Sequence, residues 1–191
     1  DVSIGDISRA EFARSSALTH VEARRSCSEN SCYRPHTHST LSIGFIDAGA
    51  TTFAGAEGRT LRLEAGDAIV IPSGYVHACN PDDGHWMYRM IHVDQEWLAA
   101  QAPCDALVDM IRVLSGPRVR QVVGEVIDLV FADAEEAELV SAFQSLVSVL
   151  SDSAPKQTLR ADQQVGDLPR LGPVIERLQN DPVNPKVREL A

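Results

Sequence analysis

Three histidines are the residues of this sequence best placed to do chemistry. His36 and His38 stand two positions apart, and side chains at alternate positions of a strand share one face. His77 follows a Pro-Ser-Gly turn that could return the chain to the same place. Imidazoles are ligands for Zn, Ni and Fe, and three protein ligands leave one coordination position open. The trio predicts a divalent transition metal site or a ligand pocket lined by imidazoles, with satisfied core histidines as the plainer alternative.

Short segments before residue 98 have the alternation and the turn chemistry of β-strands. Their links carry Gly, Asp, Asn and Pro, and two-residue links such as 57–58 favour hairpins. Many short strands without intervening helices predict an antiparallel barrel or jelly roll. The expected strands span 21–25, 41–47, 51–54, 59–64, 68–71 and 88–94.

The strand expected at 41–47 has one polar and one apolar face. Ser42 and Gly44 have the parity of the two paired histidines, whereas Leu41, Ile43 and Phe45 lie on the other side. We therefore expect a polar cavity on one side of this strand and apolar packing on the other.

After residue 98 the apolar residues take helical spacing. Three stripes predict helices within 107–114, 119–131 and 139–150. Burying one Val or Leu is worth roughly 1.5–3 kcal/mol, so each stripe must pack against the barrel, a sister helix or a second subunit. We expect at least one of the last two helices to contact a partner subunit. A segment rich in Pro, Gln and Asp then reads as a linker, and a further helix is expected near 171–178.

The composition excludes some partners. A net charge of −10 argues against direct contact with nucleic acid, which needs clustered Lys and Arg. No apolar run approaches the length of a membrane span, so we expect no membrane partner and a cytoplasmic location. The four cysteines (Cys27, Cys32, Cys79 and Cys104) are too few for a disulfide scaffold. The roles of Cys27, Cys32 and Cys79 stay open between packed thiols, a redox switch and a thiolate ligand.

Further candidates for ligand contact lie near the last expected strand. Trp86, Tyr88 and Arg89 form an aromatic and cationic cluster that could recognise an effector by stacking and charge, with simple packing of Trp86 as the alternative. His92 shares the parity of Tyr88, although a core or surface position is the favoured interpretation. His20 and His85 are expected at the surface.

Two segments resemble the sequence motifs of the cupin barrel. Ser42 stands where the first motif has Glu, and Asn80 comes one position before the Asn of the second. Without that Glu the site lacks its anionic ligand and its obvious acid–base group, which favours binding over catalysis. The positions in register are His36, His38 and Gly49 in the first motif, and Gly66, Pro72, Gly74 and His77 in the second.

A narrower family fits more of the chain. The sensor domain of AraC-type transcriptional regulators resembles this sequence at YRPHTH (33–38), IPSGYVHAC (71–79) and WMYRM (86–90). The resemblance implies an α+β fold: a cupin-like antiparallel β-barrel (jelly roll) followed by a C-terminal helical section. It implies an arm at 1–17, a sensor barrel at 18–98, a helical dimerisation section at 99–153, a linker at 154–168, and a helix with the start of a helix-turn-helix domain at 169–191.

The resemblance also implies a function. We expect a non-enzymatic, bacterial, homodimeric domain that senses a small-molecule effector through His36, His38, Ser42, His77, Trp86, Tyr88 and Arg89. DNA would be contacted only by a C-terminal domain, because 185–191 reads as the first turns of a helix that continues beyond Ala191. The alternative is a small metal-dependent cupin enzyme, a dioxygenase or an isomerase. The identity of the effector, the target DNA and the choice between activation and repression stay open.

Overall fold

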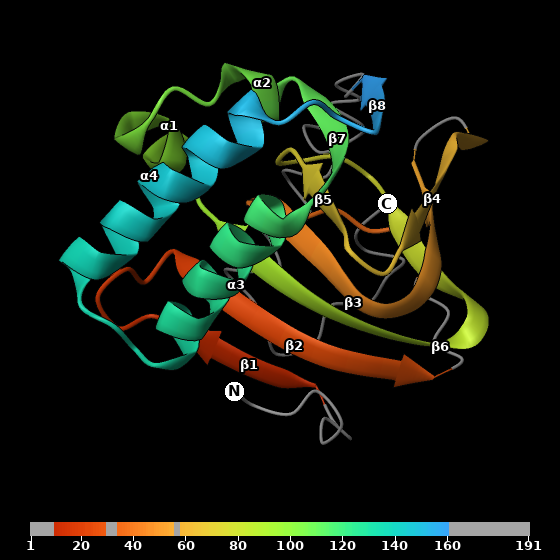
Figure 1. Cartoon of the computed structure of the whole chain (residues 1–191), viewed down its shortest axis with the longest axis horizontal. Helices are drawn as coiled ribbons and strands as arrows, with labels where there is room; N and C mark the ends of the chain where they lie inside the picture. Colours follow the sequence, from red (N-terminus) through yellow and green to blue (C-terminus); the bar gives the residue numbers. More distant parts are fainter. Residues whose placement is uncertain (1–9, 30–33, 56–57, 161–191) are drawn as a thin grey trace, which may run out of the picture. The chain divides into compact units, whose positions relative to one another are not determined.

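The computed structural model describes residues 10–29, 34–55 and 58–160 (Figure 1). The strands are β1 (Glu11–Arg14), β2 (Val21–Glu29), β3 (Leu41–Ala54), β4 (Thr60–Glu64), β5 (Asp67–Ile71), β6 (Ala78–Val93), β7 (Met110–Ser115) and β8 (Gln157–Arg160). The helices are α1 (Gln95–Gln101), α2 (Asp105–Val108), α3 (Pro117–Phe131) and α4 (Glu136–Asp152).

One antiparallel sheet contains all of these strands. Its order is β1-β2-β6-β3-β5-β7-β8, and β4 pairs with the second half of β3. β3 and β6 are long because they remain paired from Leu41 opposite Val93 to Ala54 opposite Ala78. Their register shifts at Gly49, where φ is +76° and an added Cβ would lie 2.5 Å from the carbonyl oxygen of His85. Glycine is therefore required at this bend of the sheet.

The two faces of the sheet carry different clusters of side chains. Leu41, Ile43 and Phe45 of β3 belong to the outer cluster, which packs against the helices. This confirms the apolar face predicted for the strand at 41–47. The sheet curls around an inner cluster made of side chains from β3, β4, β5, β6 and β7 and from the loop between β5 and β6. Its buried members are Ile46, Phe53, Leu61, Leu63, Ile69, Ile71, Tyr75, Trp86, Tyr88, Ile111 and Val113.

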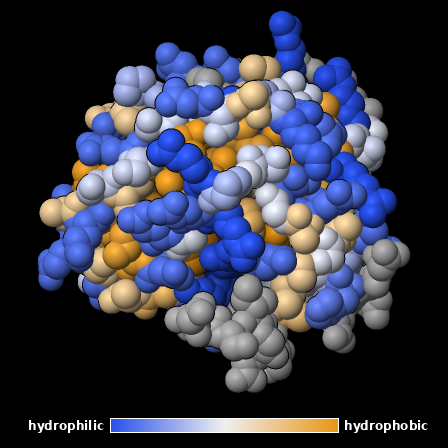
Figure 2. All heavy atoms as spheres, viewed as in Figure 1, coloured by the Kyte–Doolittle hydropathy of each residue, from blue (hydrophilic) through white to orange (hydrophobic). Residues whose placement is uncertain are grey.

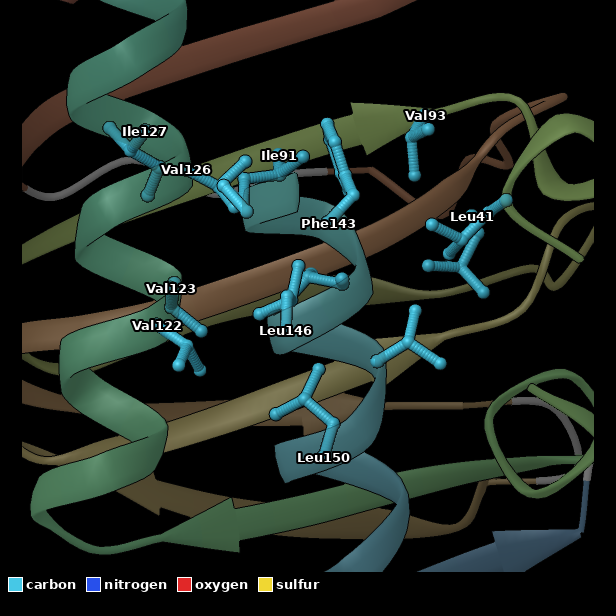
Figure 3. Packing of buried hydrophobic residues seen from close by; sticks show 14 of the residues in the cluster. Leu41, Ile91, Val93, Val122, Val123, Val126, Ile127, Phe143, Leu146 and Leu150 are labelled. Atoms are coloured by element: carbon cyan, nitrogen blue, oxygen red, sulfur yellow. The ribbon is translucent and has the colours of Figure 1, made fainter. Parts of the chain in front are cut away.

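Helices α3 and α4 lie side by side on the outer face (Figure 1). Figure 3 shows their apolar side chains directed toward one another and toward the sheet. Hydrophilic side chains cover much of the face seen in Figure 2, with apolar ones between them. Because the sheet and the neighbouring helix already bury both apolar stripes, the stripes no longer require a second subunit. Figure 3 labels Val122, Val123, Val126 and Ile127 of α3, Phe143, Leu146 and Leu150 of α4, and Leu41, Ile91 and Val93 of the sheet, which all belong to this cluster.

The helix predicted at 107–114 is wrong. Helix α2 ends at Val108, and Met110–Ser115 forms β7 between β5 and β8. A short apolar run fits a buried strand as well as a helix, and here the free edge of β5 decides in favour of the strand. The sheet also extends beyond the expected 18–98 barrel, since β1 falls in the predicted arm and β8 in the predicted linker.

Some sequence predictions lie outside the described residues. These are Cys32, residues 1–9 of the expected arm, the linker from 161 onward, the helix near 171–178 and the helix opening at 185–191. Within the described parts of the chain, no helix is both long enough and apolar enough to cross a membrane.

Candidate functional site

The backbone brings His36 and His77 together. The amide of His36 donates to the carbonyl of His77 at 2.9 Å, and the amide of His77 donates back to the carbonyl of His36 at 2.8 Å. Gly74 also donates its amide to the carbonyl of His38 at 2.8 Å. The two segments predicted from the histidine spacing are therefore joined by main-chain hydrogen bonds.

The three predicted histidines form one cluster. Ring centroids lie 4.6 Å apart for His36 and His77, 5.0 Å for His36 and His38, and 5.5 Å for His38 and His77. One nitrogen from each ring can be chosen so that all three lie within 4.8 Å of one another. This spacing is compatible with three ligands of a single metal ion.

Hydrogen bonds to carbonyl groups define the tautomer of two of these rings. Nδ1 of His36 donates to the carbonyl of Arg34 at 2.8 Å, and Nδ1 of His77 donates to the carbonyl of Tyr75 at 3.0 Å. A carbonyl oxygen can only accept, so each Nδ1 carries the hydrogen and each neutral ring has its lone pair on Nε2. Metal-binding histidines are commonly oriented in this way.

A fourth histidine joins the cluster. The ring of His92 lies 4.6 Å from that of His38, and its Nδ1 shares a hydrogen bond of 2.9 Å with Oγ of Ser42. The sequence analysis favoured a core or surface position for His92. Its parity with Tyr88 was the signal that pointed instead to the cavity, which both residues line. Ser42, at the position of the cupin Glu, thus holds an imidazole at the edge of the site.

Burial favours the neutral form of three imidazoles of the cluster, those of His38, His77 and His92. It lowers the pKa of His77 and of His92 to about 4 in each case, and nearby imidazoles add to the effect. Burial and then the neighbouring His36 also lower the pKa of His38. Burial raises the pKa of the Cys79 thiol to about 12, so near neutral pH Cys79 is a thiol rather than a thiolate. His38, His77 and His92 therefore offer neutral nitrogen donors to the site.

Two cavities adjoin the cluster. The smaller, of about 80 Å³, is lined by the four histidines and by Arg24, Cys79, Trp86, Tyr88 and Met90. The larger, of about 600 Å³, is more polar and falls within the usual size range of small-molecule sites. Arg24, His38 and His92 line both cavities. A molecule in the larger cavity can therefore reach the imidazoles.

The predicted aromatic and cationic cluster is only partly assembled. Trp86 stacks on Tyr88 with ring centroids 4.2 Å apart, and both line the smaller cavity. Arg89 lies on the opposite face of β6, where it donates two hydrogen bonds of 2.8 Å to the carboxylate of Asp47. Because adjacent residues of a strand face opposite ways, the structure does not bring Arg89 to Tyr88 and the pocket.

Arg24 of β2 supplies the cation at this place. Its guanidinium carbon lies 5.3 Å from the ring centroid of Tyr88 and 5.0 Å from that of Phe12. The sequence analysis missed Arg24, since only the register of β2 against β6, with Arg24 opposite Met90, puts it beside the aromatic pair. The alternation of Val21 and Ala23 with polar residues was the available signal.

The other described histidines and cysteines, apart from Cys79, lie outside the histidine cluster. His85 is exposed, as expected, and its ring approaches the Cys27 sulfur at 3.8 Å. The expectation that His20 is exposed is wrong, because its ring packs against Trp97 with centroids 4.7 Å apart. Cys104 is buried among the helices.

An antiparallel sheet that curls around a histidine-lined pocket and carries helices on its other face defines a cupin-type ligand-binding domain. The sequence profile described as "AraC-like ligand binding domain" matches residues 18–168 of this chain. The chain belongs to that family. This confirms the resemblance read from the sequence and the predicted fold class.

Solved structures show weaker similarity, and among curated proteins none matches the chain. A protein from Neisseria meningitidis is 16% identical over 47% of this chain and 87% of its own, with a TM-score of 0.39. A cupin-2 domain-containing protein from Shewanella frigidimarina is 17% identical over 46% and 81%, with a TM-score of 0.39. A DMSP lyase from Ruegeria pomeroyi is 27% identical over 40% and 39%, with a TM-score of 0.37.

Proposed function

We propose that this chain is the effector-sensing part of an AraC-type transcriptional regulator. One observation carries the proposal: two adjoining cavities share Arg24, His38 and His92 on the inner face of the sheet. A small molecule that spans the two cavities would contact His38 and His92 and, from the smaller cavity, the Trp86–Tyr88 stack. Ser42 would be linked to it through its hydrogen bond with His92. Family membership supports a binding role for such a pocket.

The strands offer a route from the pocket to the helices. In β6, His92 lines the cavities while the adjacent Ile91 packs in the cluster that contains α3 and α4. Binding that shifts β6 would therefore change the packing of the helices. A ligand can bias such a change only through different affinities for the two arrangements. Homodimerisation through 99–153, DNA binding by a domain beyond the linker and a cytoplasmic location are parts of the same proposal.

A divalent transition metal is a further part of the proposal. His36, His38 and His77 fit Zn, Ni or Fe, since their nitrogens converge and two of the rings are oriented by carbonyl groups. Such an ion would act as a Lewis acid that attracts an oxygen or nitrogen atom of the ligand. Elemental analysis of protein purified without a chelator or a histidine tag tests this part, and metal-free protein would contradict it.

A small metal-dependent cupin enzyme, a dioxygenase or an isomerase, is the second candidate. The converging histidines favour it, because three ligands leave a coordination position for a substrate. Ser42 weakens it, since no described carboxylate lines the smaller cavity to act as acid or base. Turnover of any substrate that depends on added Fe or Ni would decide for the enzyme.

Hydrogen exchange combined with a ligand screen tests the sensor function. We expect a small molecule that raises the melting temperature, is recovered unchanged, and alters exchange in β6 and α3. A His38→Asn variant should lose the response, whereas His85→Asn, at an exposed position outside both cavities, should keep it. Binding that is unaffected by His38→Asn would contradict a site in this pocket.

A further inference from the structure

Ser42 and His92 form a buried pair beside the histidine cluster. The two residues lie directly opposite each other in the register of β3 on β6, and Oγ of Ser42 lies 2.9 Å from Nδ1 of His92. Ser42 is only 1% exposed, and among the described residues His92 is the hydrogen-bond partner of its hydroxyl group. Because a buried hydroxyl hydrogen without an acceptor costs free energy, the hydroxyl group of Ser42 donates to Nδ1 of His92.

This hydrogen bond determines which nitrogen of the His92 ring carries hydrogen. A neutral imidazole that accepts at Nδ1 has its hydrogen on Nε2, and a protonated imidazole also has hydrogen on Nε2. His92 therefore has an N–H donor at Nε2 in either protonation state. His36 and His77 have the opposite arrangement, because carbonyl groups hold the hydrogen of each ring on Nδ1. The pocket thus combines nitrogen lone pairs with one oriented N–H donor.

The position of His92 distinguishes it from the three candidate metal ligands. The nitrogens that lie within 4.8 Å of one another come from His36, His38 and His77, and His92 is not a member of that set. A nitrogen that carries hydrogen has no lone pair for a metal ion, so the tautomer of His92 agrees with its place outside the set. Its ring nevertheless lies 4.6 Å from that of His38 and lines both cavities. A molecule that spans the two cavities therefore contacts His92.

An N–H donor beside a metal ion distinguishes oxygen ligands from nitrogen ligands. An oxygen atom can give one lone pair to the ion and still accept a hydrogen bond with another. The nitrogen of an amine or an imidazole gives its single lone pair to the ion and then has none for an N–H group. Three protein ligands leave one coordination position open, and the donor of His92 adjoins the cluster that would supply them.

We propose that His92 determines the specificity of the pocket by selecting an effector that coordinates through oxygen, an inference that rests on the metal-binding part of the proposed function. The effector is a carboxylate, carbonyl or hydroxyl compound. Its oxygen reaches the ion held by the three histidines and accepts a hydrogen bond from Nε2 of His92. Ser42 is a positioning residue, because it acts through His92.

Two small probes test this assignment in cobalt-loaded protein. Acetate offers oxygen and imidazole offers nitrogen, and the visible absorption of Co(II) reports the binding of each. His92→Phe should weaken the binding of acetate at least about tenfold, since a hydrogen bond to a charged group is worth that much, and should leave the binding of imidazole nearly unchanged. His92→Gln keeps an N–H donor and should retain part of the affinity for acetate. The matched control is His85→Phe, at an exposed position outside both cavities, which should behave like the wild type.

Further variants keep the assignment falsifiable. Ser42→Ala tests the pair if His92→Phe fails to fold, and it should reduce the preference for acetate over imidazole. Arg24 is present in all of these variants, so its charge does not produce the difference. Equal weakening of both probes, or acetate binding that His92→Phe does not change, would overturn the role of His92 and leave the metal site intact. Protein that binds no cobalt, or cobalt binding that survives in His77→Asn, would overturn the metal-binding part and this inference together, whereas the ligand screen decides the sensor function separately.

Discussion

Mild acid should destabilise the metal-free protein through its buried imidazoles. His77 is 3% exposed, and its pKa falls from 6.5 to about 4 on folding. Below pH 6.5 this imidazole is protonated in the unfolded chain but stays neutral in the folded protein until the pH approaches 4. The free energy of unfolding therefore decreases as the pH drops from 6.5 toward 4, and this contribution to stability is complete above pH 6.5. At 1.36 kcal/mol per pKa unit, the loss from His77 between pH 7.5 and 5 is about 2 kcal/mol. The lowered pKa of His92 acts in the same direction.

Urea denaturation followed by circular dichroism, at several pH values from 7.5 to 5, measures this effect. His77→Asn removes the titrating group and keeps an N–H that can donate to the carbonyl of Tyr75. Its free energy of unfolding should fall less over this range than that of the wild type, by about 2 kcal/mol. His85→Asn removes an exposed imidazole and should follow the wild type. Equal pH slopes for wild type and His77→Asn would refute the reasoning.

Three more predictions concern stability. Arg89→Leu should lower the free energy of unfolding, measured by urea denaturation, by about 3–5 kcal/mol, because it leaves the carboxylate of Asp47 buried without its partner at 6% side-chain exposure. Adding Asp47→Leu should restore part of that stability, and an unchanged midpoint for Arg89→Leu would contradict the prediction. Phe143→Ala should cost about 3–5 kcal/mol, since the ring is 0% exposed, whereas Gln144→Ala at an exposed position should cost little. Zinc at a hundredfold excess over its Kd should add about 2.7 kcal/mol to the free energy of unfolding, and a gain that persists in His77→Asn would place the ion elsewhere.

Local patterns in the sequence were enough to predict much of the fold. Alternation at 41–47 predicted which side chains of β3 face the helices, and Leu41, Ile43 and Phe45 lie there. The stripes of α3 and α4 were long enough to be unambiguous. The convergence of His36, His38 and His77 was also predicted from spacing, but the reason given for it was wrong: His36 and His38 precede β3 rather than lying in a strand, and His36 is held by an isolated bridge to His77.

What the sequence could not provide depends on pairing between distant segments. The position of Arg24 beside the aromatic pair requires the register of β2 on β6, which no pattern within either strand contains. Arg89 was assigned to the pocket from its nearness in sequence to Tyr88, although strand alternation turns it toward Asp47. The run at 110–115 became a strand because β5 and β8 lie on either side of it.

The main-chain bridge between His36 and His77 separates the architecture of the pocket from its reactivity. Peptide groups, which every residue except proline provides in full, hold these two positions opposite each other. Other side chains placed there would face the same space at the same separation. Substitution at these two positions can therefore change what the pocket attracts while its shape is preserved, so relatives with this bridge can diverge in ligand preference without rebuilding the sheet.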